Sequence, residues 1–169
     1  ALAQIENITA DNARLVSNLH ANLGGLYRMN GYPDLAREHM EKSISLLDQF
    51  NLLHINDSIP QIANYAMFLT EQQEPERGIS ELQKLSGIIK EYHSDDCLDY
   101  AKVQETLGTI YLMTANLPQA KTHFKKAFKI YEKIWADEPE MIEAKYREIQ
   151  ELYPQIGFSI GKTLSGLLT

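Results

Sequence analysis

The sequence predicts an all-α solenoid, in which antiparallel helix pairs stack one after another along the chain. Three segments share the pattern of a large apolar residue, a small residue, two variable residues and another large apolar residue. They are Leu23–Tyr27, Tyr65–Leu69 and Leu107–Tyr111, which follow one another at steps of 42 residues. A fixed period between about 20 and 50 residues is typical of stacked supersecondary units. Such units bury their apolar faces against their neighbours, and the stack exposes an extended concave surface.

Each repeat is expected to contain a helix A, a short turn and a helix B. Repeat 1 is expected at about residues 12–51, repeat 2 at 54–93 and repeat 3 at 95–136. The first helix A is predicted from about Ala13 to Met29, because its apolar residues recur at three- and four-residue steps. Asp11 or Asn12 is expected to cap this helix, and Asp95 or Asp96 the third helix A, because carboxylate and amide oxygens accept from free N–H groups.

The turns between helices A and B are predicted from glycine and proline. They are Asn30-Gly31, Gln73-Glu74 and Ala115-Asn116, each followed by a proline, namely Pro33, Pro75 or Pro118. Gly31 can adopt the left-handed conformation that often ends a helix. Proline suits the first turn of the next helix, where a backbone N–H has no partner.

Small residues in the middle of both helices predict a close helix crossing in every repeat. Gly24, Ala66 and Gly108 occupy helix A, and Ala36, Gly78 and Ala120 occupy the facing position of helix B. Glycine inside a helix costs about 1 kcal/mol relative to alanine. A backbone that passes very close to its neighbour explains that cost.

After repeat 3 we expect one capping helix over residues 138–153, so that residues 1–153 form a single domain. Pro139 lies in its first turn, and Ile149 falls 42 residues after Leu107. Residues 154–169 form an apolar tail, which is expected to dock on the last repeat or on another copy of the chain. A homo-oligomer formed through this tail is therefore one hypothesis.

These motifs resemble the tetratricopeptide repeat. Repeat 3 matches best, through Leu107, Gly108, Tyr111, Ala120 and Phe124. The family period is about 34 residues, and the longer period of 42 looks like the kinesin-light-chain type. The resemblance implies a right-handed superhelical solenoid that is not an enzyme and binds a peptide of a partner protein in its concave groove.

The resemblance also implies which residues line that groove, because helix A faces it in this family. Kinesin-light-chain repeats often have Asn before the Leu-Gly pair, where this chain has Asn22 and Asn64. An amide both donates and accepts, so it can bridge the backbone of an extended peptide. The alternative is a purely internal hydrogen bond. The predicted peptide-binding residues are Asn18, Asn22, Gly25, Arg28, Asn64, Met67, Lys102, Glu105 and Thr109.

Composition argues against several other functions. The net charge of −7 and pI near 5.2 argue against nucleic-acid binding. No apolar run reaches the roughly 18 residues of a membrane span, and the single Cys97 provides no disulfide framework. No residue pattern indicates a catalytic site, a metal site or a cofactor. We expect a cytoplasmic protein, and the sequence, which starts without Met, is expected to be part of a longer chain.

Three functions remain open at this level. The first is a protein-interaction module, the second a peptide-sensing regulatory domain of a larger bacterial regulator, and the third a self-assembling scaffold. A run of lysines at mostly four-residue steps adds one further alternative. Lys121, Lys125, Lys126, Lys129 and Lys133 form either a solvated helix face or a second docking site for an acidic partner.

Overall fold

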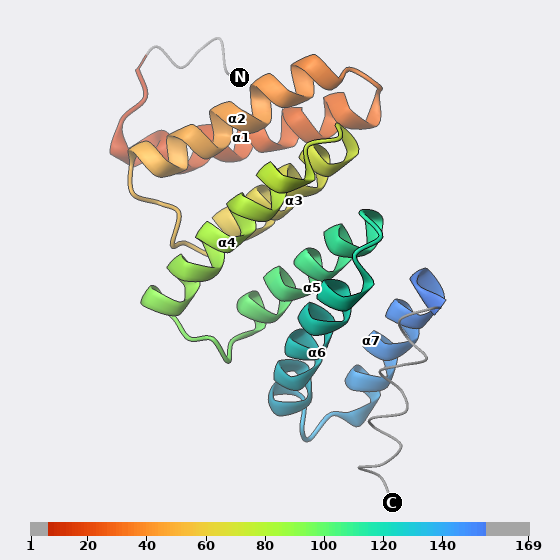
Figure 1. Ribbon diagram of the computed structural model, residues 1–169. Helices are drawn as coiled ribbons and strands as arrows, with labels where there is room; N and C mark the ends of the chain where they lie inside the picture. The colour runs from red at the N-terminus through yellow and green to blue at the C-terminus, as the bar shows by residue number, and fades with distance from the viewer. Residues whose placement is uncertain (1–6, 155–169) are drawn as a thin grey trace, which may run out of the picture. The chain divides into compact units, whose positions relative to one another are not determined.

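The computed structural model describes residues 7–154 of a chain that divides into two compact units, Ala1–Asp95 and Asp96–Thr169. The first unit contains α1 (Ala10–Met29), α2 (Pro33–Gln49), α3 (Ser58–Glu71) and α4 (Pro75–Tyr92). The second contains α5 (Leu98–Met113), α6 (Leu117–Ile134) and α7 (Pro139–Leu152). Helix α1 packs against α2, α3 against α4 and α5 against α6 (Figure 1).

The described residues contain helices and no strands, which confirms the predicted all-α class built from helix pairs. Helix α7 lies in the segment where a helix after the third repeat is expected. The handedness of a superhelix and the single-domain organisation of residues 1–153 stay predictions. The apolar tail lies outside the described residues, apart from Pro154.

The three turns within the helix pairs share one backbone geometry. Gly31, Gln73 and Ala115 have φ values of 76°, 64° and 59°, so each adopts the left-handed conformation at intervals of 42 residues. In each turn the next residue donates its N–H to a carbonyl five residues earlier. These bonds are Tyr32 to Tyr27 at 2.9 Å, Glu74 to Leu69 at 2.8 Å and Asn116 to Tyr111 at 2.7 Å. This is the Schellman arrangement, which satisfies the last carbonyls of a helix.

Replacing Ala115 by glycine is expected to stabilise the second unit by about 0.5–1 kcal/mol. A side chain in the left-handed conformation is strained, and glycine adopts it without that strain. The measurement is urea unfolding of the wild type and Ala115→Gly. Gly31→Ala is the reverse control, since it introduces the same strain at φ 76° and should destabilise the protein. Equal stability of all three proteins would contradict this explanation.

The predicted close crossings are present in all three helix pairs. A Cβ added to Gly24 would lie 2.6 Å from Cγ of Met40, and one added to Gly108 would lie 2.9 Å from Cδ2 of Phe124. A Cβ added to Gly78 would lie 2.6 Å from the carbonyl oxygen of Ala66, which belongs to the α3 backbone. Packing therefore requires glycine at these three positions, as the sequence predicts.

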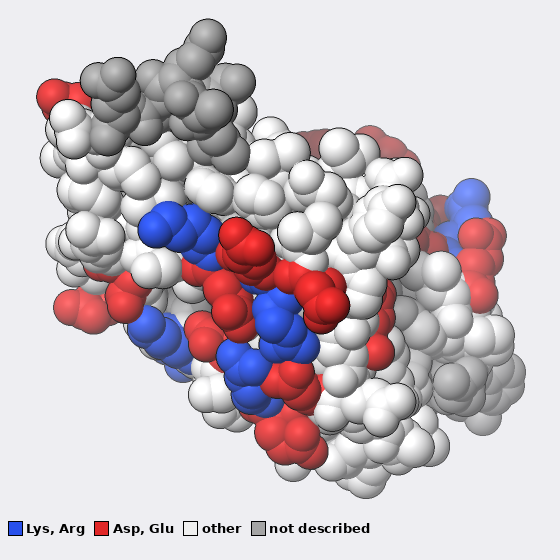
Figure 2. All heavy atoms as spheres, turned by 90° about the horizontal axis from the view of Figure 1, so that it is seen from above, with Lys and Arg blue, Asp and Glu red and all other residues white. Residues whose placement is uncertain are grey.

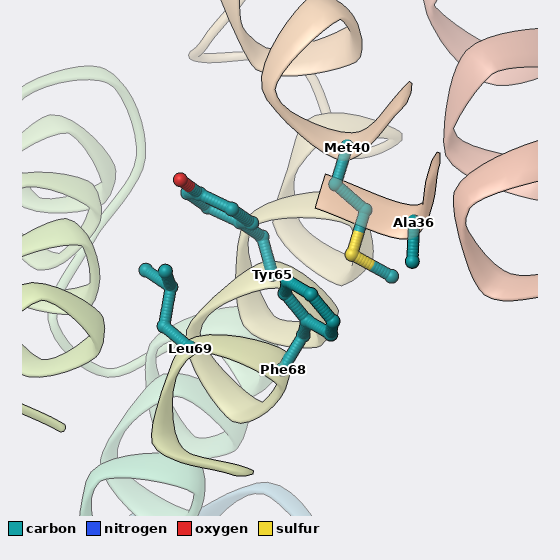
Figure 3. Packing of buried hydrophobic residues seen from close by; sticks show 5 residues of the cluster. All are labelled: Ala36, Met40, Tyr65, Phe68 and Leu69. Carbon is teal, nitrogen blue, oxygen red and sulfur yellow. The ribbon is translucent and has the colours of Figure 1, made fainter. Parts of the chain in front are cut away.

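The core of the first unit continues from one helix pair into the next. Ala36 and Met40 of α2 pack against Tyr65, Phe68 and Leu69 of α3, and all five are at most 4% exposed (Figure 3). Four of them, Ala36, Met40, Tyr65 and Leu69, are positions that recur at the repeat period, whereas Phe68 is one of the two variable positions between Tyr65 and Leu69. Most of the residues that join α2 to α3 are thus also the residues that define the period in the sequence.

The predicted cap positions are wrong for both α1 and α5, although Asn12 does accept a backbone N–H at the start of α1. Helix α1 begins at Ala10 after the cap residue Thr9, whose backbone N–H donates to Oδ1 of Asn12 over 2.8 Å. Helix α5 is capped by Cys97, whose Sγ accepts from the Tyr100 N–H at 3.4 Å. Thr9 has extended backbone geometry, as a cap residue normally does, and it precedes the predicted positions.

A network of charged side chains links α2, α3 and α4. Glu74 accepts from Arg37 and from Arg77, both at 2.5 Å, and Glu41 accepts from the Tyr65 hydroxyl at 2.8 Å. Burial raises the pKa of Tyr65, and its hydrogen bond to Glu41 adds to that increase. On the face seen from above, acidic and basic side chains are interleaved, not gathered by sign (Figure 2).

Candidate functional site: the groove between α1 and α3

A groove of about 750 Å³ lies within the first unit, between α1 and α3. Helix α2 contributes Met40 and Ser43 to its lining. The groove is lined by Asn18, Ala21, Asn22, Gly25, Arg28, Met29, Met40, Ser43, Asp57, Pro60, Gln61, Asn64 and Glu71. Its volume lies within the range of about 300–1,000 Å³ that is usual for ligand sites.

Helices α1 and α3 run in the same direction, and the residues that face each other across the groove are about one repeat apart in the sequence. Arg14 contacts Asp57, Asn18 contacts Gln61 and Arg28 contacts Glu71, and each pair is 43 residues apart. Asn22 of α1 and Asn64 of α3 therefore lie near the same level of the groove. Both are exposed, and neither amide has a hydrogen-bond partner among the described residues. Two free amides thus line the middle of the groove.

An ion pair joins α1 to α3 near each end of the groove. Arg14 contacts Asp57 at 2.7 Å. Arg28 makes two contacts with Glu71, one of them a hydrogen bond of 2.8 Å from its Nε. The hydrogen bond from Arg14, followed by one from Asn18, lowers the pKa of Asp57. The charged groups of the lining thus have partners of opposite sign.

A polar cluster that includes part of the groove lining holds α1, α2 and α3 together. Oε1 of Gln61 accepts from the Ser17 hydroxyl at 2.8 Å and also from the Ser43 hydroxyl. Nε2 of Gln61 donates to Oδ1 of Asn18 at 2.6 Å. Ser17 and Ser43 are 0% and 1% exposed, so their hydroxyls depend on these partners. Asn18 consequently supports the groove wall from within.

Gly25 differs from the three glycines at the helix crossings. A Cβ added there would meet no atom within 4 Å, so packing does not require glycine at this position. Gly87 on α4 is equally open, but it does not line the groove. Glycine at position 25 lowers helix stability and keeps the α1 backbone accessible from the groove. Met29, 86% exposed, lies one turn further along.

The nine predicted peptide-binding residues fall into three groups. Asn18, Asn22, Gly25, Arg28 and Asn64 line the groove, whereas Met67 lies half-buried on α3 outside the lining. The other three belong to α5 of the second unit, and they are Lys102, Glu105 and Thr109. The structure therefore brings five of the nine together in one groove.

Glu105 is part of a contact between α5, α6 and α7. It accepts from the Tyr131 hydroxyl at 2.6 Å and forms an ion pair with Lys145 at 2.8 Å. Thr109 donates to the backbone carbonyl of Glu105 at 3.1 Å, and Lys102 lies 4.0 Å from Asp99. Only 18% of the Glu105 side chain is exposed, so its main contacts are internal.

The structure also brings together two histidines that the sequence pattern left scattered. Nδ1 of His20 on α1 lies 2.8 Å from Nδ1 of His39 on α2, and Tyr27 stacks on His39 at 5.3 Å between ring centroids. In the third repeat, Gln104 and His123 make the equivalent bond of 2.9 Å, and Tyr111 stacks on His123. His39 and His123 are 84 residues apart, which is two repeat periods. This spacing is the signal in the sequence that could have pointed to the two equivalent contacts.

Stability is expected to fall between pH 7.5 and 5.5 because of these histidines. Burial lowers the pKa of His20, and nearby His39 and Lys42 lower it further, while Glu38 opposes them. Burial also lowers the pKa of His123, with a contribution from Lys126. Below about pH 6.5 the unfolded chain therefore binds protons more readily than the folded one, so stability decreases as the pH falls.

The variant His20→Gln tests this expectation, because it copies the Gln104–His123 pair of the third repeat. Its melting temperature should fall less between pH 7.5 and 5.5 than that of the wild type. Thermal unfolding followed by circular dichroism at both values measures the difference. An identical pH dependence of the two proteins would show that His20 does not carry the effect.

Across residues 7–154, no three His, Cys, Asp or Glu side chains are grouped as metal ligands. No helix in this range is long and apolar enough to cross a membrane.

Comparison with known proteins finds one repeat family that part of the chain matches. Residues 58–133 match the tetratricopeptide repeat family. A solved structure, BtubC (BKLC) from P. vanneervenii, is similar to this chain with a TM-score of 0.66 at 18% identity, over 78% of the chain. The chain spans only 50% of the length of that protein. No curated protein matches the chain.

Proposed function

We propose that this chain, a tetratricopeptide repeat protein, binds an extended peptide segment of a partner protein in the groove between α1 and α3. Tetratricopeptide repeats generally mediate protein–protein interactions, and the match covers residues 58–133. The observation that carries the proposal is the pair of groove-lining amides, Asn22 and Asn64, that have no hydrogen-bond partner among the described residues.

The chemistry of the lining favours peptide backbone as the ligand. Each free amide offers two donors and an acceptor, which match the carbonyl and N–H groups of an extended chain. The charged side chains at the groove ends, Arg28 with Glu71 and Asp57 with Arg14, are already paired. The bound segment therefore needs no charge of its own.

The length of the groove sets the length of the bound segment. From Asn18 to Arg28 the α1 axis rises about 15 Å, at 1.5 Å per residue. An extended chain advances about 3.3 Å per residue. The groove thus accommodates about five residues of an extended segment.

The test is a selection of peptides from a random library on the wild-type protein, followed by affinity measurements with Asn22→Ala/Asn64→Ala. Losing hydrogen bonds to two amides should weaken binding about 10- to 30-fold, at about 1 kcal/mol for each amide. Because both residues are exposed, the melting temperature should stay unchanged. Gln49→Ala/Gln83→Ala removes two exposed amides from α2 and α4 and serves as the control.

A pair of glycine variants tests the groove independently of the amides. Gly25→Ala and Gly87→Ala should both stabilise their helices by up to about 1 kcal/mol, because neither Cβ meets another atom. Only Gly25→Ala should weaken the binding of the selected peptides, because only the methyl group at position 25 projects from the groove lining. Peptides that bind all of these variants as tightly as the wild type would place binding outside the groove.

A further inference from the structure

Helix α6 is strongly basic although the whole chain is acidic. It carries five of the eleven lysines of the chain and a single acidic residue, Glu132, whereas the net charge of the chain is −7. All five lysines lie on one side of the helix. At about 100° per residue, Lys121 to Lys133 fall within an arc of about 140°. The buried residues of α6, Ala120, Phe124 and Ala127 among them, lie on the opposite side.

Outside α6, basic side chains of the described residues mostly have acidic partners within 4.0 Å. The paired residues are Arg14, Arg28, Arg37, Arg77, Lys84, Lys90, Lys102 and Lys145. On α6 itself, Lys133 pairs with Asp96. The basic residues without such a partner within residues 7–154 are Lys42, Arg147 and four lysines of α6, namely Lys121, Lys125, Lys126 and Lys129. The lack of intramolecular partners is thus concentrated on α6.

We propose that Lys121, Lys125, Lys126 and Lys129 form a docking surface for an acidic, extended segment of a partner protein. Charge complementarity determines the sign of the partner. Lys121, Lys125 and Lys129 follow one another at about 6 Å along the helix axis. Alternate side chains of an extended segment are about 6.6 Å apart. A segment with Asp or Glu at every second position can therefore pair with these three lysines in succession.

The surface shares no residue with the peptide groove, because it uses only α6 of the second unit. The groove variant Asn22→Ala/Asn64→Ala should therefore leave it intact. The probe is a fluorescein-labelled peptide of alternating Glu and Ser, whose binding is followed by fluorescence anisotropy at low ionic strength. The same peptide with Gln in place of Glu is the uncharged control.

The wild type should bind the Glu-Ser peptide, and binding should weaken as salt is added. Lys121→Gln/Lys125→Gln/Lys129→Gln should bind it about tenfold more weakly, since the variant loses three exposed ion pairs that each contribute modestly. The matched control is Lys42→Gln/Lys84→Gln/Lys90→Gln, which removes the same number of positive charges from α2 and α4. That control should bind like the wild type.

Four results would overturn the proposal. The first is that the peptide does not bind the wild type. The second is that both triple variants bind the peptide equally weakly, which would indicate general electrostatic attraction without a defined site. Loss of binding in Asn22→Ala/Asn64→Ala would place the peptide in the groove. The fourth is that the wild type binds a DNA duplex more tightly than the Glu-Ser peptide and the α6 triple variant does not. The partner of this surface would then be a nucleic acid and not an acidic protein segment.

Discussion

Gly78→Ala is expected to destabilise the first unit by about 2–3 kcal/mol, although alanine favours helix formation. The added Cβ would lie 2.6 Å from the carbonyl oxygen of Ala66 and 3.3 Å from its carbonyl carbon. These are backbone atoms in the middle of α3, so they cannot move aside as a flexible side chain can. Helices α3 and α4 must separate, and overpacking of this kind typically costs about 1–3 kcal/mol or more.

The measurement is urea unfolding of the wild type, Gly78→Ala and Gly87→Ala. Gly87 lies on the same helix, and a Cβ there meets no atom within 4 Å. Gly87→Ala should therefore show the helix-forming effect of alanine alone, a gain of up to about 1 kcal/mol. A gain of the same size for Gly78→Ala would mean that the two helices are not in close contact.

Gln61→Ala is expected to cost about 2–3 kcal/mol of stability. Gln61 is 9% exposed and bonds with Ser17, Ser43 and Asn18. Each of these bonds contributes about 1 kcal/mol, and removal of the side chain leaves a cavity between three helices. The same change should weaken peptide binding, because the cluster supports the groove wall at Asn18.

Gln83→Ala is the matched control for this prediction. Gln83 is exposed on α4, and substitutions at such positions usually change stability by less than about 0.5 kcal/mol. Thermal and urea unfolding of both variants provide the comparison. If Gln61→Ala is as stable as Gln83→Ala, the buried hydrogen bonds of Gln61 contribute nothing net to stability.

The helix pairs could be predicted because the information is periodic and local. Apolar residues at three- and four-residue steps mark one face of each helix, and a small residue recurs where two helices cross. The contact of Gly78 with Ala66 follows from this pattern, since both positions belong to the repeat. The resemblance to the tetratricopeptide repeat is carried by the same residues.

The helix caps were harder to predict because several residues near each helix start can accept a hydrogen bond. Thr9, Asp11 and Asn12 are all suitable residue types, and the backbone conformation decides among them. At α5 the acceptor is the sulfur of Cys97, although two aspartates directly precede it. The known residue preferences at helix N-caps alone favour the aspartate oxygens over the cysteine sulfur as acceptors.

The internal contacts of the groove residues could not be read from the sequence either. Asn18 and Asn22 are one helical turn apart and are both asparagines. Only Asn18 reaches Gln61, because the register between α1 and α3 determines which amide meets a polar side chain. The contact of Glu105 with Lys145 joins residues 40 positions apart in the same way.

The short turns within the helix pairs also bear on how fast the protein folds. Each turn leaves few residues between two helices that pack on each other, so most contacts of a pair are local in sequence. Folding rates rise as contacts become more local, and helical bundles that are rich in local contacts fold in about microseconds to milliseconds. A helix pair is then the smallest element that gains packing energy, and each pair can serve as a nucleus to which the next one adds.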